Sequence, residues 1–480
     1  MIRANLEYNM CEDDRIVAEL GNKMALLEET LKSHRAAMAL NAENTDVRFN
    51  TAQVLTSLAE GILESEAQQT AKVPARTLLE EAVDLFTTCL TSQQQEYDKL
   101  RTEFAEAQAD QAVQEQEGLG QQENVGGASK EEDMETASTA SSGPGEWAFV
   151  EEPLTPESIL ETCTAQLSAL TTLLCLYDPA DLPAIEAKAQ YGLKTANSGV
   201  PTLIALIRDS PFQKVKDEPT GPTLSIAPPS ASEGFQTTPK DDALLAVANF
   251  EAALAELAYR NGRTTSTQYA SFIEGLFAKS IQPPQSPDQN SVYLNALSAY
   301  SDALIDLASA IADSPQYDPT SPTFTTSLET QWTALNQAQK ILTQLSTGAN
   351  ASLFPPSRLA DTFLARGDTE LFRFRVALSE GAKPAWANST NVLVGNAGVY
   401  YRGARTYAEK AGKEVVRTTA DAKAVVAEVL KEVEGKGAGL VVAKEGWKGK
   451  GVEIKRVLEQ MVEEGILGRA EAEGVLGLVQ

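Results

Sequence analysis

The stretch that most constrains this chain is residues 36–60, which read AAMALNAENTDVRFNTAQVLTSLAE. Apolar residues recur at steps of three and four on both sides of a short Asn/Glu/Asp segment. This pattern predicts the end of one amphipathic helix, a tight turn and the start of another. A pair of such helices cannot bury its apolar faces alone and is stable only when further pairs stack on it. The stretch therefore predicts an all-α chain of stacked helix pairs, an α-solenoid.

The residue spacing resembles the tetratricopeptide repeat, a helix pair of about 34 residues. On this register Thr45 opens a repeat, Ala52 is its small residue and Leu55 its large apolar one. The second helix is expected at residues 77–90, TLLEEAVDLFTTCL. The matching small residues Ala37 and Cys89 lie 52 positions apart. We therefore expect an insertion near residues 61–72.

The remaining chain contains several further helical patterns and few other elements. Helices are predicted at residues 20–40, 155–177, 185–192, 202–208, 241–260, 266–278, 291–312, 328–345, 358–368 and 391–407. No convincing helix is predicted before residue 20. In the segment 358–368, RLADTFLARGD, Gly367 falls where such repeats place a turn glycine.

Composition divides the chain into six segments. Residues 106–152 carry 12 acidic side chains and one lysine, with too few apolar residues to offset the cost of ordering the backbone. We expect TPR-like helix pairs at 1–100, a disordered acidic insertion at 101–153, a helical continuation at 154–209, a Pro/Ser/Thr-rich linker at 210–240, C-terminal TPR-like helices at 241–408 and an extension at 409–480. The extension is expected to be a tail that ends in a helix, and the sequence predicts no fold for it.

The charge of the chain is strongly acidic and unevenly spread. Forty Lys and Arg stand against 67 Asp and Glu, a net charge of −27. Residues 409–480 are nearly neutral, with 12 basic and 13 acidic side chains, so the excess lies in the preceding segments. Such a field repels nucleic acids and anionic membranes and attracts polycations. Acidity that merely keeps the protein soluble is the alternative explanation.

Nothing in the sequence predicts an enzyme, a metal site or a cofactor site. The four cysteines at 11, 89, 163 and 175 have no metal-ligand spacing, and Cys89 and Cys163 fall on apolar helix faces. His34 is the only histidine, so no triad or His-rich metal site can form, and we expect it to pack in or beside the core. Neither GxxxxGK[ST] nor GxGxxG occurs. The acidic start MIRANLEYNMCEDDR predicts no secretory or mitochondrial leader, and no apolar run approaches the roughly 18 residues of a membrane span.

Two runs carry a more specific resemblance. LNAENTDVRFNTAQVLTSLAEG and EEPLTPESILETCTAQLSALTTLLCL flank the acidic insertion. They look like the fungal tetratricopeptide-type dedicated assembly chaperones of the large-subunit ribosomal protein L-four. The resemblance covers residues 26–206 well and 243–407 loosely, and it does not explain the nearly neutral C-terminal extension.

The resemblance implies that the chain captures a basic, unfolded loop of the newly made client. It implies further that the chain shields this loop and escorts the client, with a nuclear import receptor, from cytoplasm to nucleus. On the repeat register Asp46, Asn50, Gln53 and Asp361 would face the partner, and Phe49 would add an apolar contact. Asn50 and Phe49 also fit ordinary repeat packing. An acidic concave surface suits such a client, because it can neutralise the loop and still release it to the more densely charged RNA.

Two other partner-binding functions remain open. A co-chaperone that grips the acidic C-terminal peptide of a heat-shock chaperone needs a clamp of Lys, Arg and Asn. Asn50 fits that clamp, but Asp46 and Gln53 beside it supply no cation. A scaffold subunit of a nuclear or trafficking complex is the other alternative, and no residue discriminates it.

Overall fold

The computed structural model describes residues 2–12, 14–65, 68–119, 154–178, 180–209, 237–284, 290–434 and 451–479. Within these ranges every regular element is a helix and no strand occurs, which confirms the predicted all-α class.

The first half of the chain contains α1 (Ile2–Glu12), α2 (Asp14–Leu20), α3 (Lys23–Leu40), α4 (Thr45–Ser65), α5 (Gln68–Leu119), α6 (Pro156–Leu176), α7 (Leu182–Lys194), the π-helix η1 (Thr195–Gly199) and α8 (Val200–Asp209). The second half contains α9 (Pro239–Arg260), α10 (Ser266–Phe277), α11 (Asn290–Ala312), α12 (Phe324–Leu345), α13 (Gly348–Leu353), α14 (Pro356–Ala377), α15 (Pro384–Ala387), α16 (Thr390–Ala411), α17 (Glu414–Glu434), α19 (Gly451–Glu463) and α20 (Arg469–Val479).

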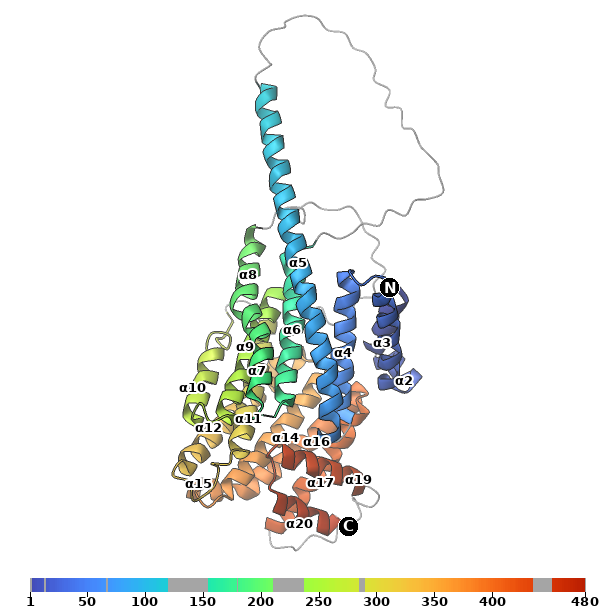
Figure 1. Cartoon of the computed structure of the whole chain (residues 1–480). Coiled ribbons are helices and arrows are strands. Elements are labelled where there is room, and N and C mark those ends of the chain that lie inside the picture. Colours follow the sequence, from blue (N-terminus) through green and yellow to red (C-terminus); the bar gives the residue numbers. More distant parts are fainter. Residues whose placement is uncertain are drawn as a thin grey trace, which may run out of the picture.

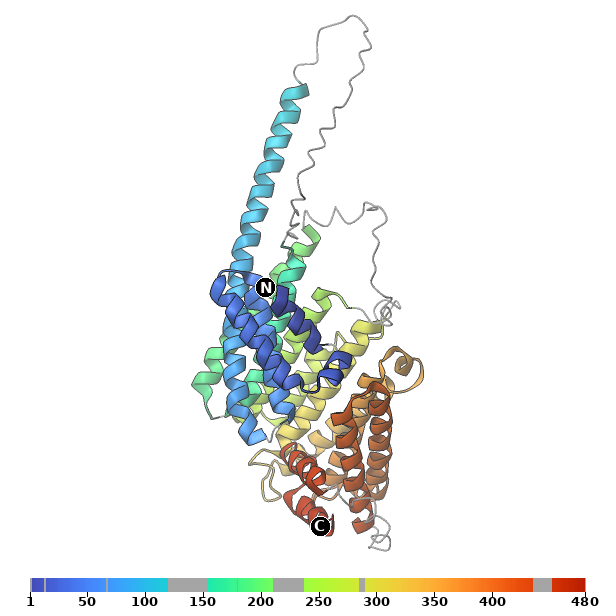
Figure 2. The same cartoon turned by 90° about the vertical axis from the view of Figure 1, so that its right-hand side faces the viewer.

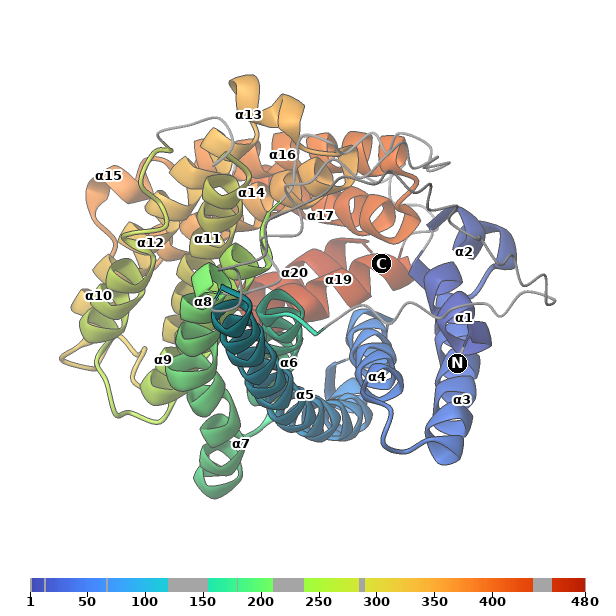
Figure 3. The same cartoon turned by 90° about the horizontal axis from the view of Figure 1, so that it is seen from above.

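The long helices pack on their successors in chain order (Figure 1). Helix α4 packs on α5, α5 on α6, α6 on α9, α9 on α11, α11 on α12, α12 on α14, α14 on α16 and α16 on α17. Seen from above, this series curves from α4 round to α17, and α19 and α20 lie in the middle of the view (Figure 3). The architecture is the predicted α-solenoid.

The apolar interior forms three clusters in series rather than one centre. The first joins α1 and the helices from α3 to α9 and includes Leu55, Phe86 and Leu170, all buried. The second lies around α10–α12, and the third joins the C-terminal helices. Serial cores of this kind are expected when each helix pair covers only its neighbours.

The N-terminal region departs from the prediction, because two helices precede residue 20. Helix α1 packs against α3 and supplies the buried Ala4 and Cys11. His34 on α3 is only 1% exposed, and loss of hydration lowers its pKa. The packing prediction for His34 is confirmed.

Residues 61–72, where the sequence predicts an insertion, fall at the end of α4 and the start of α5. Helix α4 runs to Ser65 and α5 begins at Gln68, so the extra residues of this repeat lengthen its helices. Helix α5 also continues through 101–119, where disorder was expected, and its far end projects beyond the other helices (Figures 1 and 2). The run is rich in Glu, Gln and Ala, which favour helix even where few apolar residues occur. Residues 120–153, 210–236 and 435–450 lie outside the described residues, and with them most of the predicted insertion and linker.

One helix, α6, is long and apolar enough by composition to cross a membrane, although the sequence analysis expected no such run. It packs between α5 and α9, and Ile159, Leu167 and Leu174 are buried there. This position in the core accounts for its apolar composition.

Gly367 is not a turn glycine but lies in the interior of α14. A side chain here would overlap the ring of Tyr401, so glycine lets α14 and α16 approach closely. The described part of 409–480 ends in helices as expected, but these helices pack on the solenoid instead of forming a separate tail. Helices α17, α19 and α20 contribute Val426, Leu458 and other buried residues to the third cluster.

We expect Gly367→Ala to destabilise the protein by about 1–3 kcal/mol, because overpacking forces rings and backbone to shift. The measurement is urea-induced unfolding followed by circular dichroism. Gly275→Ala on α10 is the matched control, because its new methyl group would meet no atom within 4 Å. That control should be neutral or slightly stabilising. Equal stability of the two variants would contradict the packing role of Gly367.

Candidate functional site

A cavity of about 470 Å³ lies where α6, α9, α10, α11 and the start of α14 meet. Its lining comprises Thr171, Cys175, Leu245, Asn249, Ala252, Ala253, Glu256, Tyr269, Asn295, Ser298, Ala299, Asp302, Ala303, Asp306 and Arg358. Five helices thus bring together residues that are far apart in the sequence.

The carboxylates of Asp302, Asp306 and Glu256 dominate the charge of the cavity. Asp302 and Asp306 are four residues apart on α11, so both project from one helix face. Solvent reaches both side chains through the cavity, although protein surrounds them in depth. Burial in this environment, partly countered by Arg358, raises the pKa of Asp302 to about 6. Burial, followed by the nearby charges of Glu256 and Asp302, raises the pKa of Asp306 well above its ordinary value.

Two arginines approach this cluster, and both have other partners. Arg260 donates to Glu256 over 2.7 Å and to Asp313 over 3.2 Å. Arg358 donates to the side-chain oxygen of Asn295 over 2.7 Å. In the described part of the chain, no hydrogen bond or ion pair holds the carboxylate of Asp306. The cavity therefore contains one carboxylate without an ion-pair partner among the described residues.

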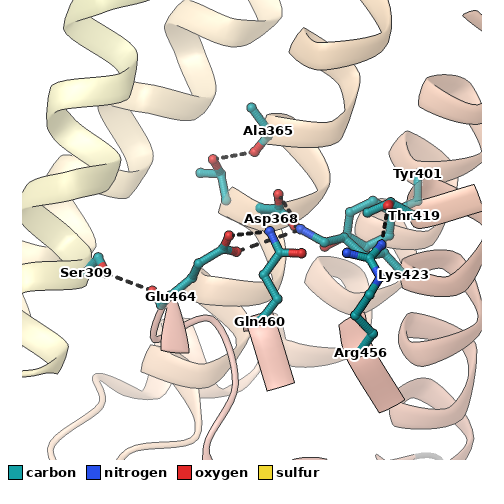
Figure 4. A network of polar contacts seen from close by, with 10 residues as sticks. Ser309, Ala365, Asp368, Tyr401, Thr419, Lys423, Arg456, Gln460 and Glu464 are labelled. Carbon is teal, nitrogen blue, oxygen red and sulfur yellow. Dashed lines mark hydrogen bonds and ion pairs between the residues drawn. The ribbon is translucent and has the colours of Figure 1, made fainter. Parts of the chain in front are cut away.

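The C-terminal helices add a further carboxylate next to Asp306. Glu464 follows the last residue of α19, and its charge contributes to the raised pKa of Asp306. The backbone carbonyl of Glu464 accepts a 2.8 Å hydrogen bond from Ser309 on α11 (Figure 4). The side chain of Glu464 accepts a hydrogen bond from Gln460 over 2.7 Å.

A buried ion pair supports this arrangement (Figure 4). The ammonium group of Lys423 on α17 lies 2.8 and 2.9 Å from the two carboxylate oxygens of Asp368 on α14. Tyr401 on α16 donates its hydroxyl to the same Asp368 over 2.8 Å. Glu464 is farther from Lys423, at 3.9 Å. These contacts link α17 and the turn after α19 to α14 and α16.

The five residues predicted from sequence lie outside this cavity. Asp46 is exposed on α4, and Gln53 is half-buried on the same helix. The Asn50 amide donates to Asn5 on α1 over 3.0 Å. The ring of Phe49 packs edge-on against Phe86, with centroids 5.7 Å apart, which fits the packing alternative.

Asp361, the fifth predicted residue, is exposed on α14. Helix α14 lies across the curve of helices from α4 (Figure 3). The structure therefore groups four of the predicted residues on one helix and sets the fifth apart from them.

Sequence reasoning missed Asp302, Asp306, Glu256 and Glu464 as a group. One signal was present, because Asp302 and Asp306 are the only charged residues in the 23-residue helix α11. Two acids on one face of an otherwise apolar helix indicate either a buried network or a site. The sequence gives no sign that these two aspartates lie near Glu256 of α9 and near Glu464 in the turn after α19.

Comparisons with known proteins give no family for this chain. No family model matches it, and no curated protein matches it. Among solved structures it is similar to a circular tandem repeat protein with novel repeat topology and enhanced subunit contact surfaces, at 11% identity and a TM-score of 0.29, covering 99% of this chain and 93% of that one. A likeness this weak carries no functional argument.

We expect Asp306→Asn to stabilise the protein at neutral pH. An acid with a higher pKa in the folded than in the unfolded state keeps a proton that the unfolded chain releases, so its contribution to stability falls as pH rises through that interval. The gain of the variant should be small near about pH 4, close to the ordinary pKa of aspartate, and larger at about pH 8. Thermal unfolding at both pH values measures it. Asp98→Asn on the exposed face of α5 is the control and should show no such trend.

Lys423→Met should destabilise the protein by about 3–5 kcal/mol, because it leaves the half-buried Asp368 without its cation. Lys455→Met removes an exposed lysine 3.8 Å from Glu459 and should cost under about 1 kcal/mol. Chemical denaturation measures both. The double variant Lys423→Met, Asp368→Asn should recover part of the loss. Equal losses in the two single variants would refute the structural role of the buried pair.

Proposed function

We propose that this protein is a dedicated chaperone that binds and shields a basic, unfolded segment of a newly made large-subunit ribosomal protein. The resemblance of two sequence runs suggests protein L-four as the client. On this proposal the complex forms in the cytoplasm and enters the nucleus, with a nuclear import receptor as a further partner. The protein acts by holding its client and performs no chemical reaction.

The observation that carries this proposal is the acidic cavity of α9 and α11, in which Asp306 has no ion-pair partner in the described chain. Asp302 and Glu256 line the same cavity, and the charge of Glu464 also acts on Asp306, while Arg260 and Arg358 have hydrogen-bond partners of their own. Such a surface favours a positively charged occupant and disfavours an acidic one. The net charge of −27 adds long-range attraction for a polycation.

The heat-shock co-chaperone alternative finds less support. A carboxylate clamp needs free cations on the surface that holds the peptide. Asn50 has its amide engaged by Asn5, and Asp46 on the same helix is acidic. An acidic peptide would therefore meet repulsion on this helix.

Capture of the full-length protein from native extract at low salt, followed by mass spectrometry, tests the proposal. We expect one basic ribosomal protein in stoichiometric amount, and we expect its capture to weaken as salt screens the contact. A heat-shock chaperone as the main partner, or an acidic partner that salt does not displace, would refute the proposal.

The purified pair allows a sharper measurement. Asp46→Lys combined with Asp361→Lys should weaken binding about fivefold, equivalent to about 1 kcal/mol. Glu274→Lys combined with Asp98→Lys is the matched control, because the two substitutions make the same total charge change at exposed positions of α10, at the outer edge of the solenoid (Figure 3), and of α5. Equal effects of the two changes would show that only net charge matters.

A further inference from the structure

The lining of the cavity between α9 and α11 contains more acidic than basic side chains. Three carboxylates line it, those of Glu256, Asp302 and Asp306. Glu256 is paired with Arg260, and Arg358 attracts Asp302. No cation in the described chain forms an ion pair with Asp306, which solvent reaches through the cavity. An unpaired carboxylate that lines an open acidic cavity favours an external cation, which would complete the set of charges.

We propose that this cavity is a binding site for a single arginine side chain of a bound polypeptide, whose guanidinium pairs with Asp306. This inference rests on the proposed function, since it takes the occupant from a basic client segment. It adds to that proposal a defined position, the cavity between α9 and α11, at which one client residue is recognised.

The lining suits arginine better than a compact cation. The apolar wall of Leu245, Ala252 and Ala299 can cover the methylene stem of a long side chain. Acceptor oxygens in the lining come from the carboxylates and from Asn249 and Ser298. A guanidinium offers five donors in a fixed plane and can serve several acceptors at once, whereas an ammonium offers three at one point. Among the residues that the structure describes, no three His, Cys, Asp or Glu side chains are grouped to hold a metal ion, which favours an organic cation.

The same geometry couples binding to a proton. The groups that act on Asp306 are Glu256 and Arg260 on α9, Asp302 on its own helix and Glu464 after α19. The thiol of Cys175, the phenol of Tyr269 and the guanidinium of Arg358 complete the titratable lining. In the empty cavity, burial and the acidic neighbours raise the pKa of Asp306, so this carboxyl keeps its proton to a higher pH than an ordinary aspartate does. A bound guanidinium favours the ionised form, so binding releases this proton and strengthens as pH rises.

Isothermal titration calorimetry on the full chain tests the site. The probe is an acetylated, amidated peptide of alternating arginine and glycine, and the matched probe replaces each arginine by citrulline, which keeps the shape and removes the charge. Titrations in phosphate and in Tris buffer at one neutral pH report the protons released, because the two buffers differ in ionisation enthalpy. We expect the arginine peptide to bind with proton release and the citrulline peptide to bind at least tenfold more weakly.

Asp306→Asn should weaken arginine-peptide binding about tenfold and abolish the buffer dependence of the heat. Asp98→Asn on α5 removes the same charge outside the cavity and should leave both unchanged. Because Asp306→Asn is expected to stabilise the fold, a loss of binding cannot be attributed to unfolding, and the thermal midpoint checks this.

Three results would overturn the inference: binding and proton release unchanged in Asp306→Asn, equal binding of the citrulline peptide, or spermidine binding more tightly than the peptide with the same dependence on Asp306. The last result would assign the cavity to a free polyamine. The capture experiment separates this inference from the proposed function. If the wild-type protein and Asp306→Asn capture a basic client equally well, the arginine site is refuted and the proposed function stands. If arginine-peptide binding depends on Asp306 but no ribosomal client is captured, the proposed function is refuted and the arginine site stands.

Discussion

Each helix pair of this chain leaves an apolar face that only the next pair can cover, and this requirement for stacking governs the structure. It explains why the interior is divided into three clusters in series, from Leu55 and Leu170 near the N-terminus to Val426 near the C-terminus. It also explains the closeness of α14 and α16, where Gly367 lies under the ring of Tyr401.

Two groups of charged side chains in this structure differ in how their charges are balanced. Lys423 and Asp368 form a buried pair whose charges satisfy each other, supported by the hydroxyl of Tyr401. Asp302 and Asp306 are reached by solvent through the cavity, but the surrounding protein raises their pKa values, so the folded state is destabilised by keeping them ionised. Proteins retain such unfavourable groups chiefly where binding or catalysis needs them. The first pair holds the C-terminal helices in place, and the second is suited to a ligand.

The C-terminal helices connect the buried ion pair to the acidic cavity. They dock through apolar residues such as Leu458 and Met461 and through the contact of Ser309 with the backbone of Glu464. That docking places the carboxylate of Glu464 close enough to influence Asp306. A segment that is nearly neutral by composition thereby adds negative charge at the place where α11 already concentrates it.

The sequence by itself determined the helical class and the positions of most helices. Apolar spacing and capping residues such as Thr155 act within a few residues, so the pattern is readable locally. Composition was less reliable, since the helix-forming run at 101–119 continues α5 where disorder was expected. Only the tertiary structure decided the site. The grouping of Glu256, Asp306 and Glu464 depends on how α9, α11 and α19 pack, and contacts between residues so far apart in the chain leave no local signal.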